Sequence, residues 1–391
     1  METARSGQRG AAPTPTPMLT QCLWSPVARA RLDSQPRMVG VLPGEGIGPE
    51  CIDAALQVLT ALEAIGGPPI QLRMGPRAPL APDQDTRPQL VAEVNSFCCE
   101  VFAEGGAILT GPFGGRFVYD QRKHFDLFCK LTPIRVSPEM AQLGRLRPEH
   151  AEGVDLVLVR ENTSGIYLGR AEATTDPTRG CVVSHSFDYA EQEVRRIVEV
   201  AARIAASRRG ELLVVVKEGG LPEMTALWRE CADAAAGEFG VRASLANIDR
   251  AAYDLVQHAR ELDVVVAGNL FGDVLADVAA VLLGSRALAC SGNFSGAGAA
   301  VYQTNHGAAW DLVGSDRANP LGQLYSLAML LRESFGLVRE ADLVDAAVAS
   351  VLRQGYRTVD LAQPADRVVG TQEMTGLVTN ALAQLGATAA P

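Results

Sequence analysis

Two aspartates stand four residues apart in the segment 268–277 of this chain. If the segment is helical after Gly272, Asp273 and Asp277 project from one face, one turn apart. Like charges at this spacing destabilise a helix slightly unless a cation lies between them. Carboxylate oxygens are the ligands that Mg2+ and Mn2+ prefer, so the pair predicts part of a divalent-metal site.

A third carboxylate, Asp249, stands at the start of a helix that we expect over 250–262. Asp249 and Asp273 each have an alternative role as helix N-caps. Asp277 lies one turn inside an apolar helix, so capping does not explain it, and a carboxylate there needs a partner. This position favours a metal site made of Asp249, Asp273 and Asp277 over three unrelated aspartates.

Two basic residues end apolar runs that are typical of buried strands. Lys217 follows the run 212–216, where desolvation would lower its pKa and let it accept a proton; the alternative is a solvated lysine. Arg160 follows the run 154–159, and Tyr167 comes after the next glycine. A planar guanidinium suits a carboxylate ligand, although a surface arginine is the alternative.

A loop over 305–320 has the residue types of a nucleotide site. It holds His306 and Gly307, then small residues including Ala309, then Asp311, and it leads into a helix at Asn319. Asp311 could accept both ribose hydroxyls of NAD and would repel the 2′-phosphate of NADP. The glycine cluster at 43–50 lacks the GxGxxG spacing, so by itself it predicts a tight strand-to-helix turn.

Alternating strand-like and helix-like runs must position these groups, and they predict an α/β architecture. The run 264–267 would bring the aspartate pair to the carboxyl end of a buried strand, where open α/β folds bind ligands. Further strands are expected over 39–42, 107–110, 154–159 and 212–216, and helices over 49–63, 190–207, 222–237, 250–262, 319–335, 340–354 and 371–385. A linker rich in Pro, Gly or Ser does not divide this body, so a second domain would be inserted.

Composition limits the partners. The 391-residue chain has a net charge of −10, which argues against nucleic acid as a partner, and it holds no apolar run long enough to span a membrane. Its eight cysteines form no CxxC motif, as expected for reduced thiols in the cytoplasm. Residues 1–36 hold repeated prolines and several arginines without an apolar period, which predicts a disordered extension, with a transit peptide as the alternative.

Together these residues resemble the isocitrate and 3-isopropylmalate dehydrogenase family of metal-dependent β-decarboxylating dehydrogenases. The resemblance spans about residues 37–385 and rests mainly on the motif 268–273 with Asp277, supported by 42–50, by 159–162 with Tyr167, and by 306–320. It implies two α/β domains that share one mixed sheet with a central cleft, not a classical Rossmann fold. The large cofactor-binding domain would be residues 37–127 and 284–391. Residues 128–283 would form an inserted small domain with the metal site and dimer contacts.

The resemblance also implies a reaction, the NAD-dependent oxidative decarboxylation of a 3-substituted malate to a 2-oxo acid and CO2, with Mg2+ or Mn2+. Such enzymes are dimers or larger, with active sites shared between chains, so we expect a homodimer here; Lys217 and Asp249 match the borrowed positions. Lys217 would take the hydroxyl proton, and Tyr167 would protonate the enol carbon. Arg122 and Arg160 match positions that bind the substrate carboxylates, and the matched cofactor positions are His306, Gly307, Ala309, Asp311 and Asn319.

This chain departs from the family pattern around the substrate. Thr132 stands where a second arginine is usual, ten residues after Arg122. Lys130 would face the same side of a strand and could partly replace the missing charge. The segment 111–121, which reads the variable substituent, matches neither the isocitrate nor the isopropylmalate pattern. Within it, Arg116 would suit an anionic substituent, whereas Val118 and Tyr119 would suit an apolar one.

These departures predict a non-standard substrate. Two alternatives stay open: a D-malate or tartrate dehydrogenase of the same family, and a non-catalytic regulatory subunit of an isocitrate dehydrogenase-like complex. Thr132, and Gly219 in place of a usual asparagine, favour the regulatory subunit. The presence of Lys217, Tyr167 and the three aspartates opposes it, because a subunit without chemistry need not keep all of them.

Overall fold

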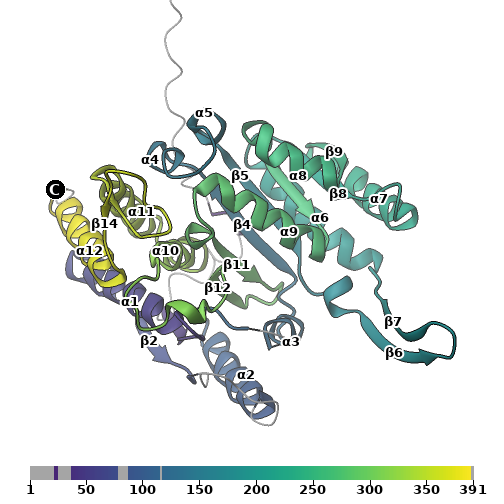
Figure 1. Cartoon of the computed structure of the whole chain (residues 1–391), viewed down its shortest axis with the longest axis horizontal. Coiled ribbons are helices and arrows are strands. Elements are labelled where there is room, and N and C mark those ends of the chain that lie inside the picture. The colour runs from purple at the N-terminus through teal and green to yellow at the C-terminus, as the bar shows by residue number, and fades with distance from the viewer. Residues whose placement is uncertain (1–21, 25–36, 78–86, 115–116, 389–391) are drawn as a thin grey trace, which may run out of the picture.

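A mixed sheet of ten strands organises the chain (Figure 1). The computed structural model describes residues 22–24, 37–77, 87–114 and 117–388. Along the sheet the strands follow the order β2 (Gln71–Met74), β1 (Met38–Leu42), β3 (Ala107–Thr110), β12 (Ala300–Thr304), β11 (Cys290–Phe294), β4 (Cys129–Arg135), β5 (Asp155–Glu161), β10 (Val264–Ala267), β8 (Glu211–Val216) and β9 (Arg242–Asn247).

The helices alternate with these strands along the chain. They are α1 (Gly48–Ala64), α2 (Arg87–Ala103), α3 (Phe117–His124), α4 (Pro138–Ala141), α5 (Pro148–Ala151), α6 (Glu191–Ala206), α7 (Pro222–Phe239), α8 (Ile248–Gln257), α9 (Asn269–Ala280), α10 (Leu321–Phe335), α11 (Val338–Arg353) and α12 (Thr371–Thr388). Short 3-10 turns include η2 (Ile166–Leu168), η3 (Ala259–Glu261), η5 (Arg286–Leu288) and η6 (Trp310–Leu312). Each strand and helix range expected from the sequence overlaps an observed element. The range 250–262 differs most, because α8 ends at Gln257 and a 3-10 turn follows.

The centre of the sheet is antiparallel and its two ends are parallel. β12 with β11, β11 with β4, and β4 with β5 pair antiparallel, whereas β1 with β3 and β5 with β10 pair parallel. This mixed pattern confirms the prediction of an α/β fold that is not a classical Rossmann fold. The strands of residues 128–283 occupy one continuous end, from β4 to β9. The division into two domains there stays a prediction.

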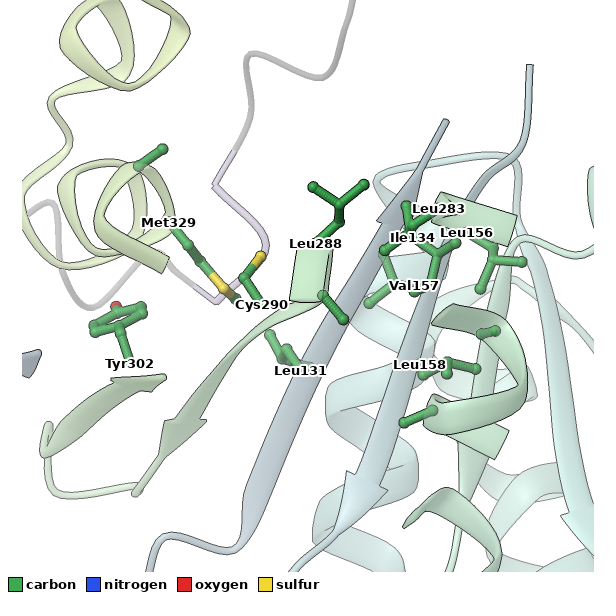
Figure 2. Close-up of a cluster of buried hydrophobic side chains, with 14 of the residues drawn as sticks. Leu131, Ile134, Leu156, Val157, Leu158, Leu283, Leu288, Cys290, Tyr302 and Met329 are labelled. Carbon is green, nitrogen blue, oxygen red and sulfur yellow. The ribbon is translucent and has the colours of Figure 1, made fainter. Parts of the chain in front are cut away.

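The core runs through the antiparallel centre. Figure 2 shows side chains of β4, β5, β11 and β12 gathered there, with Leu131, Leu156 and Tyr302 among them. These three side chains are fully buried. Helix α10 packs on β11 and β12, and it is buried on nearly all of its faces. Most of its buried side chains are apolar, and its buried charged residues, Arg332 and Glu333, are paired or hydrogen-bonded with groups of other elements.

A hairpin of β6 (Arg170–Asp176) and β7 (Gly180–Ser186) projects from the rest of the protein (Figure 1). Nearly all of its residues are exposed. A two-stranded hairpin is marginally stable in water by itself. This one therefore needs further contacts to become rigid. A smaller parallel pair, β13 (Tyr356–Arg357) and β14 (Arg367–Val368), lies near the C-terminal helices.

Most of the predicted N-terminal extension, residues 1–21 and 25–36, lies outside the described residues. Cys22, Leu23 and Trp24 are described, and they are partly buried against the body. Among the described helices none is long and apolar enough to cross a membrane.

Candidate active site

Asp273 and Asp277 lie on α9, directly after β10. The helix begins at Asn269 with Gly268 as its N-cap residue, so Asp273 lies inside the helix. The two carboxylates therefore share one face, one turn apart. Asp249 also lies inside a helix, because the N-cap residue of α8 is Asn247. The alternative that Asp249 and Asp273 cap their helices is thus wrong.

The Asp273 carboxylate binds two groups from other elements. Arg160 at the end of β5 donates a charged hydrogen bond from Nη1 to Oδ1, and the Tyr167 hydroxyl donates to Oδ2 at 3.0 Å. The same guanidinium donates from Nε and Nη2 to Oδ1 of Asn269, at 3.1 and 2.7 Å. Asn269 thus holds the Arg160 fork in position for the aspartate one helical turn later.

Gly272 permits this contact. A Cβ atom at residue 272 would lie 2.8 Å from both Cβ and Cγ of Arg160. Real Cβ atoms do not approach neighbours so closely, so a larger residue would push α9 away from β5. The glycine in the motif is explained by this close approach of helix and strand.

The electrostatics of Asp273 suit a metal ligand. Burial raises its pKa, but Arg160, Lys130 and the Tyr167 hydroxyl together lower it below its ordinary value. A carboxylate kept ionised in this way is ready for a divalent cation. Its side chain and that of Asp277 are 42% and 49% exposed, so both can meet an ion from solvent.

Asp277 has a partner that the sequence did not point to. Arg286, on η5, places Nη2 2.9 Å from Oδ2 of Asp277. The two are nine positions apart in sequence, and α9 ends between them, so helical spacing gives no signal for this pair. The charge of Arg286 also lowers the pKa of His306, a residue of the predicted cofactor loop.

Lys217 and Asp249 form a separate ion pair, with Nζ 2.6 Å from Oδ1. Both side chains are exposed, and the lysine lowers the pKa of the Asp249 carboxyl. Within the part of the chain that the structure describes, no three His, Cys, Asp or Glu side chains cluster closely enough to hold a metal ion. The assignment of Lys217 and Asp249 to a neighbouring chain's site stays a prediction.

Three buried cations surround the Asp273 end of α9. Arg122 on α3, Lys130 on β4 and Arg160 on β5 are 6%, 6% and 3% exposed. Lys130 stands directly opposite Arg160 in the antiparallel ladder. Burial and the two arginines lower the pKa of Lys130 well below its ordinary value, and burial with Arg160 lowers that of Arg122 to about 9. Buried cations that lower one another's pKa values in this way favour the binding of an anionic ligand.

The buried Nε of Arg122 has no hydrogen-bond partner within the described residues, and its guanidinium lies 5.3 Å from the ring centre of Tyr119. Thr132 is buried on β4 opposite Leu158. Its hydroxyl supplies no charge to the site. Arg116, the predicted contact for an anionic substituent, lies outside the described residues.

The predicted cofactor loop packs against the first glycine cluster. The Ile47 amide donates to the Ala308 carbonyl at 2.9 Å, and a Cβ at Gly46 would lie 1.9 Å from that oxygen. The cluster at 43–50 is therefore one wall of this loop, which its spacing alone did not reveal. Nε2 of His306 and both side-chain polar atoms of Asn305 are buried without hydrogen-bond partners in the described structure. Such orphaned polar atoms suit a polar ligand such as a nucleotide.

Asp360 joins the loop to the turn that carries Arg286. Its carboxylate accepts hydrogen bonds from Asn319 Nδ2 at 3.1 Å and from Ser285 Oγ at 2.6 Å. Thr358 donates to its other oxygen at 2.6 Å. Sequence reasoning missed Asp360, because a lone aspartate in a loop carries no pattern. Asp311 lies on η6 and is exposed, within reach of solvent and of a ligand.

Comparison with known proteins agrees with this arrangement. A family model for isocitrate/isopropylmalate dehydrogenase matches residues 38–378. The chain is 37% identical over 359 residues to 3-isopropylmalate dehydrogenase 2 of Dechloromonas aromatica (strain RCB), covering 88% of this chain and 99% of that protein. It is 36% identical over 363 residues to 3-isopropylmalate dehydrogenase of Bacillus licheniformis, covering 89% and 96%.

Solved structures show the same likeness. Isocitrate dehydrogenase from Methylococcus capsulatus superposes with a TM-score of 0.78 at 25% identity, covering 89% of this chain and all of that one. The TT0538 protein from Thermus thermophilus gives a TM-score of 0.77 at 26% identity, covering 90% of this chain and 69% of the other.

Proposed function

Because the chain belongs to the isocitrate/isopropylmalate dehydrogenase family, we propose that it oxidises and decarboxylates a 3-substituted malate with NAD, giving a 2-oxo acid and CO2. The observation that carries the proposal is the cluster in which Asp273 receives both the Arg160 guanidinium and the Tyr167 hydroxyl. The cluster brings together a carboxylate that could bind a metal ion (Asp273), a guanidinium that could bind a substrate carboxylate (Arg160) and a hydroxyl that could donate a proton (Tyr167).

Asp273 and Asp277, with Asp249 from a second copy of the chain, would hold Mg2+ or Mn2+. When bound, such an ion lowers the pKa of the substrate hydroxyl and stabilises negative charge on that oxygen after CO2 leaves. Arg122 and Arg160, with Lys130 beside them, hold the substrate carboxylates. The depressed pKa values of Arg122 and Lys130 support this, because an anion that enters would relieve the mutual repulsion of the cations.

Two residues move protons in the proposed reaction. Lys217 of the second copy, in its neutral form, would accept the proton of the hydroxyl, and bound NAD would supply the hydride acceptor. Tyr167 then gives a proton to the carbon that has lost CO2. Burial and Asp273 raise the pKa of Tyr167 to about 12, so it stays protonated and available as a donor near neutral pH.

The cofactor is assigned to the loop that carries His306, Gly307, Ala309, Asp311 and Asn319. The orphaned His306 and Asn305 side-chain atoms support a nucleotide there. The carboxylate of Asp311 favours NAD over NADP.

The substituent on the malate is proposed to be small and apolar. A cavity of about 40 Å³ lies beside Arg122, between α3 and the sheet, and its lining includes Phe113, Phe117, Val118 and Leu127. A group that extends from a carboxylate bound to Arg122 would meet these apolar side chains. This cavity favours the apolar interpretation of the segment 111–121 over the anionic one.

The active form is proposed to be a cytoplasmic homodimer. The exposed β6–β7 hairpin supports this, because a second copy could supply the contacts that the hairpin lacks within the chain. Residues 128–283, which carry this hairpin, are the proposed inserted domain with the dimer contacts. Residues 37–127 and 284–391 are the proposed cofactor domain.

The test is a screen of malates with graded 3-substituents, using purified protein, NAD and Mn2+, with NADH formation as the readout. We expect small alkyl substituents to give the highest kcat/KM, and Tyr167→Phe to lower kcat by roughly 10²–10⁴-fold, the usual range for loss of a general acid. Turnover of unsubstituted malate alone would instead identify a D-malate or tartrate dehydrogenase. Absence of NADH with every malate would overturn the proposal and favour a regulatory subunit.

A further inference from the structure

Three residues that precede the family match dock on the body of the protein. Cys22, Leu23 and Trp24 lie before residue 38, where the match begins. The Trp24 indole stacks on Phe294 with ring centroids 4.6 Å apart and planes at 17°, and it meets Phe128 edge-on at 6.1 Å. Both phenylalanines are buried. Aromatic packing of this kind stabilises beyond the area it buries.

The same segment satisfies a buried carboxylate. Glu333 on α10 is 2% exposed. The Leu23 amide donates to its Oε1 at 3.0 Å, and the Trp24 amide donates to its Oε2 at 2.8 Å. Among the described residues, these two amides supply the hydrogen bonds of this carboxylate. Burial raises the pKa of Glu333 and the two amides lower it in part, so the segment helps to keep the buried group ionised.

The docking place is the seam of the sheet. Phe294 ends β11, and Phe128 immediately precedes β4, the strand that pairs with β11. These two strands join the end of the sheet formed by residues 128–283 to the other end. Figure 2 shows the short, pale purple N-terminal segment between α10 and β11 in that view.

We infer that Glu333, Phe294 and Phe128 form a binding site for a peptide, and that its occupant is the chain's own segment of Cys22, Leu23 and Trp24. The segment acts as a strap. Two successive backbone amides engage the carboxylate, and the indole that follows covers the two phenylalanines. The strap holds α10 against the β11–β4 seam. The strap would hold α10 in place whatever reaction the active site catalyses.

A pair of deletions tests the strap. Removal of residues 1–21 keeps Trp24, whereas removal of residues 1–36 takes it away. The match to the relative from Dechloromonas aromatica covers 99% of that protein but only 88% of this chain. We therefore expect the protein that lacks residues 1–36 to fold. Its melting temperature should fall by about 1–3 °C relative to the other deletion, the shift that one or two kcal/mol gives in a body of this size. Amides of α10 and β11 should exchange hydrogen faster. Equal melting and equal exchange in the two deletions would overturn the inference.

Point variants and a peptide give a second, independent test in protein of full length. Trp24→Ala should lower the melting temperature, while Trp310→Ala, at a tryptophan whose surface is 47% exposed, should not. A synthetic peptide of residues 18–30 should raise the melting temperature of the protein lacking residues 1–36. The same peptide with Trp24→Ala should not. If neither Trp24→Ala nor the peptide changes the melting temperature, Trp24 does not anchor a strap.

Discussion

Nη2 of Arg286 lies 2.9 Å from the carboxylate of Asp277. One of the two aspartates on the exposed face of α9 is therefore already paired with a cation of the chain itself. Asp273 on the same face is likewise paired, with Arg160. The negative charges of Asp273 and Asp277, one helical turn apart, are therefore each balanced by an arginine from another element. A divalent ion at Asp277 would compete with Arg286 for this carboxylate.

Replacement of Arg286 by leucine should strengthen Mn2+ binding, because the ion no longer competes with the guanidinium. Both side chains are about half exposed, and such pairs contribute about 0.2–1 kcal/mol, so we expect a gain of roughly up to fivefold in affinity by calorimetry. Arg229→Leu removes a similarly exposed arginine, paired with Glu218, and serves as the control. Unchanged or weaker Mn2+ binding in Arg286→Leu would show that the pair does not compete with the metal.

We expect Lys130 to contribute to substrate binding in place of the arginine that is usual in the family at position 132. Lys130→Met removes a buried cation opposite Arg160. We expect KM to rise by about 10–100-fold, since a hydrogen bond to a charged group contributes about 1.5–3 kcal/mol. Thr132→Val on the same strand face is the matched control, with little expected change in KM. Equal effects of the two variants would mean that strand packing, not the lysine charge, governs binding.

The sequence allowed the helix that carries Asp273 and Asp277, and the strand ends, to be predicted because local signals determine them. The apolar run 264–267 and the pattern after it predict β10 and α9, and the strand-end positions of Arg160 and Lys217 follow from the same reasoning. Alternation along β4 likewise predicted that Lys130 and Thr132 lie on the same side of the strand.

Long-range partners were not predictable in the same way. Arg286 meets Asp277 only because two 3-10 turns redirect the chain after α9. Trp24 meets Phe294 across 270 positions, from a segment without apolar periodicity. Asp360 brings together Asn319 and Ser285 through side-chain hydrogen bonds that no spacing rule describes. These contacts depend on tertiary packing, which a single sequence does not specify by pattern.

His306 should make the protein less stable in mild acid. Burial lowers the pKa of His306, with a further decrease from Arg286, so the folded protein binds a proton there less readily than the unfolded chain does. The unfolded histidine takes up a proton as pH falls below about 6.5, and the free energy of unfolding decreases from that pH down to the folded pKa. In His306→Gln the melting temperature should therefore fall less between about pH 7.5 and about pH 5.5. His150→Gln, at an exposed histidine, is the control. A parallel decline in His306→Gln and the parent would contradict this assignment.

Gly272→Ala should damage the proposed metal site through backbone geometry alone. The new Cβ would lie 2.8 Å from two carbons of the Arg160 side chain, so α9 must move away from β5 or Arg160 must leave Asp273. Overpacking of this kind costs about 1–3 kcal/mol of stability, and the displaced aspartate should bind Mn2+ more weakly. Gly237→Ala in α7 is the matched control, because nothing lies within 4 Å of its added Cβ and alanine favours a helix by up to about 1 kcal/mol. Chemical denaturation and Mn2+ calorimetry on both variants measure the two effects. If Gly272→Ala keeps the parent's stability and Mn2+ affinity, the close packing of α9 on β5 is not what positions Asp273.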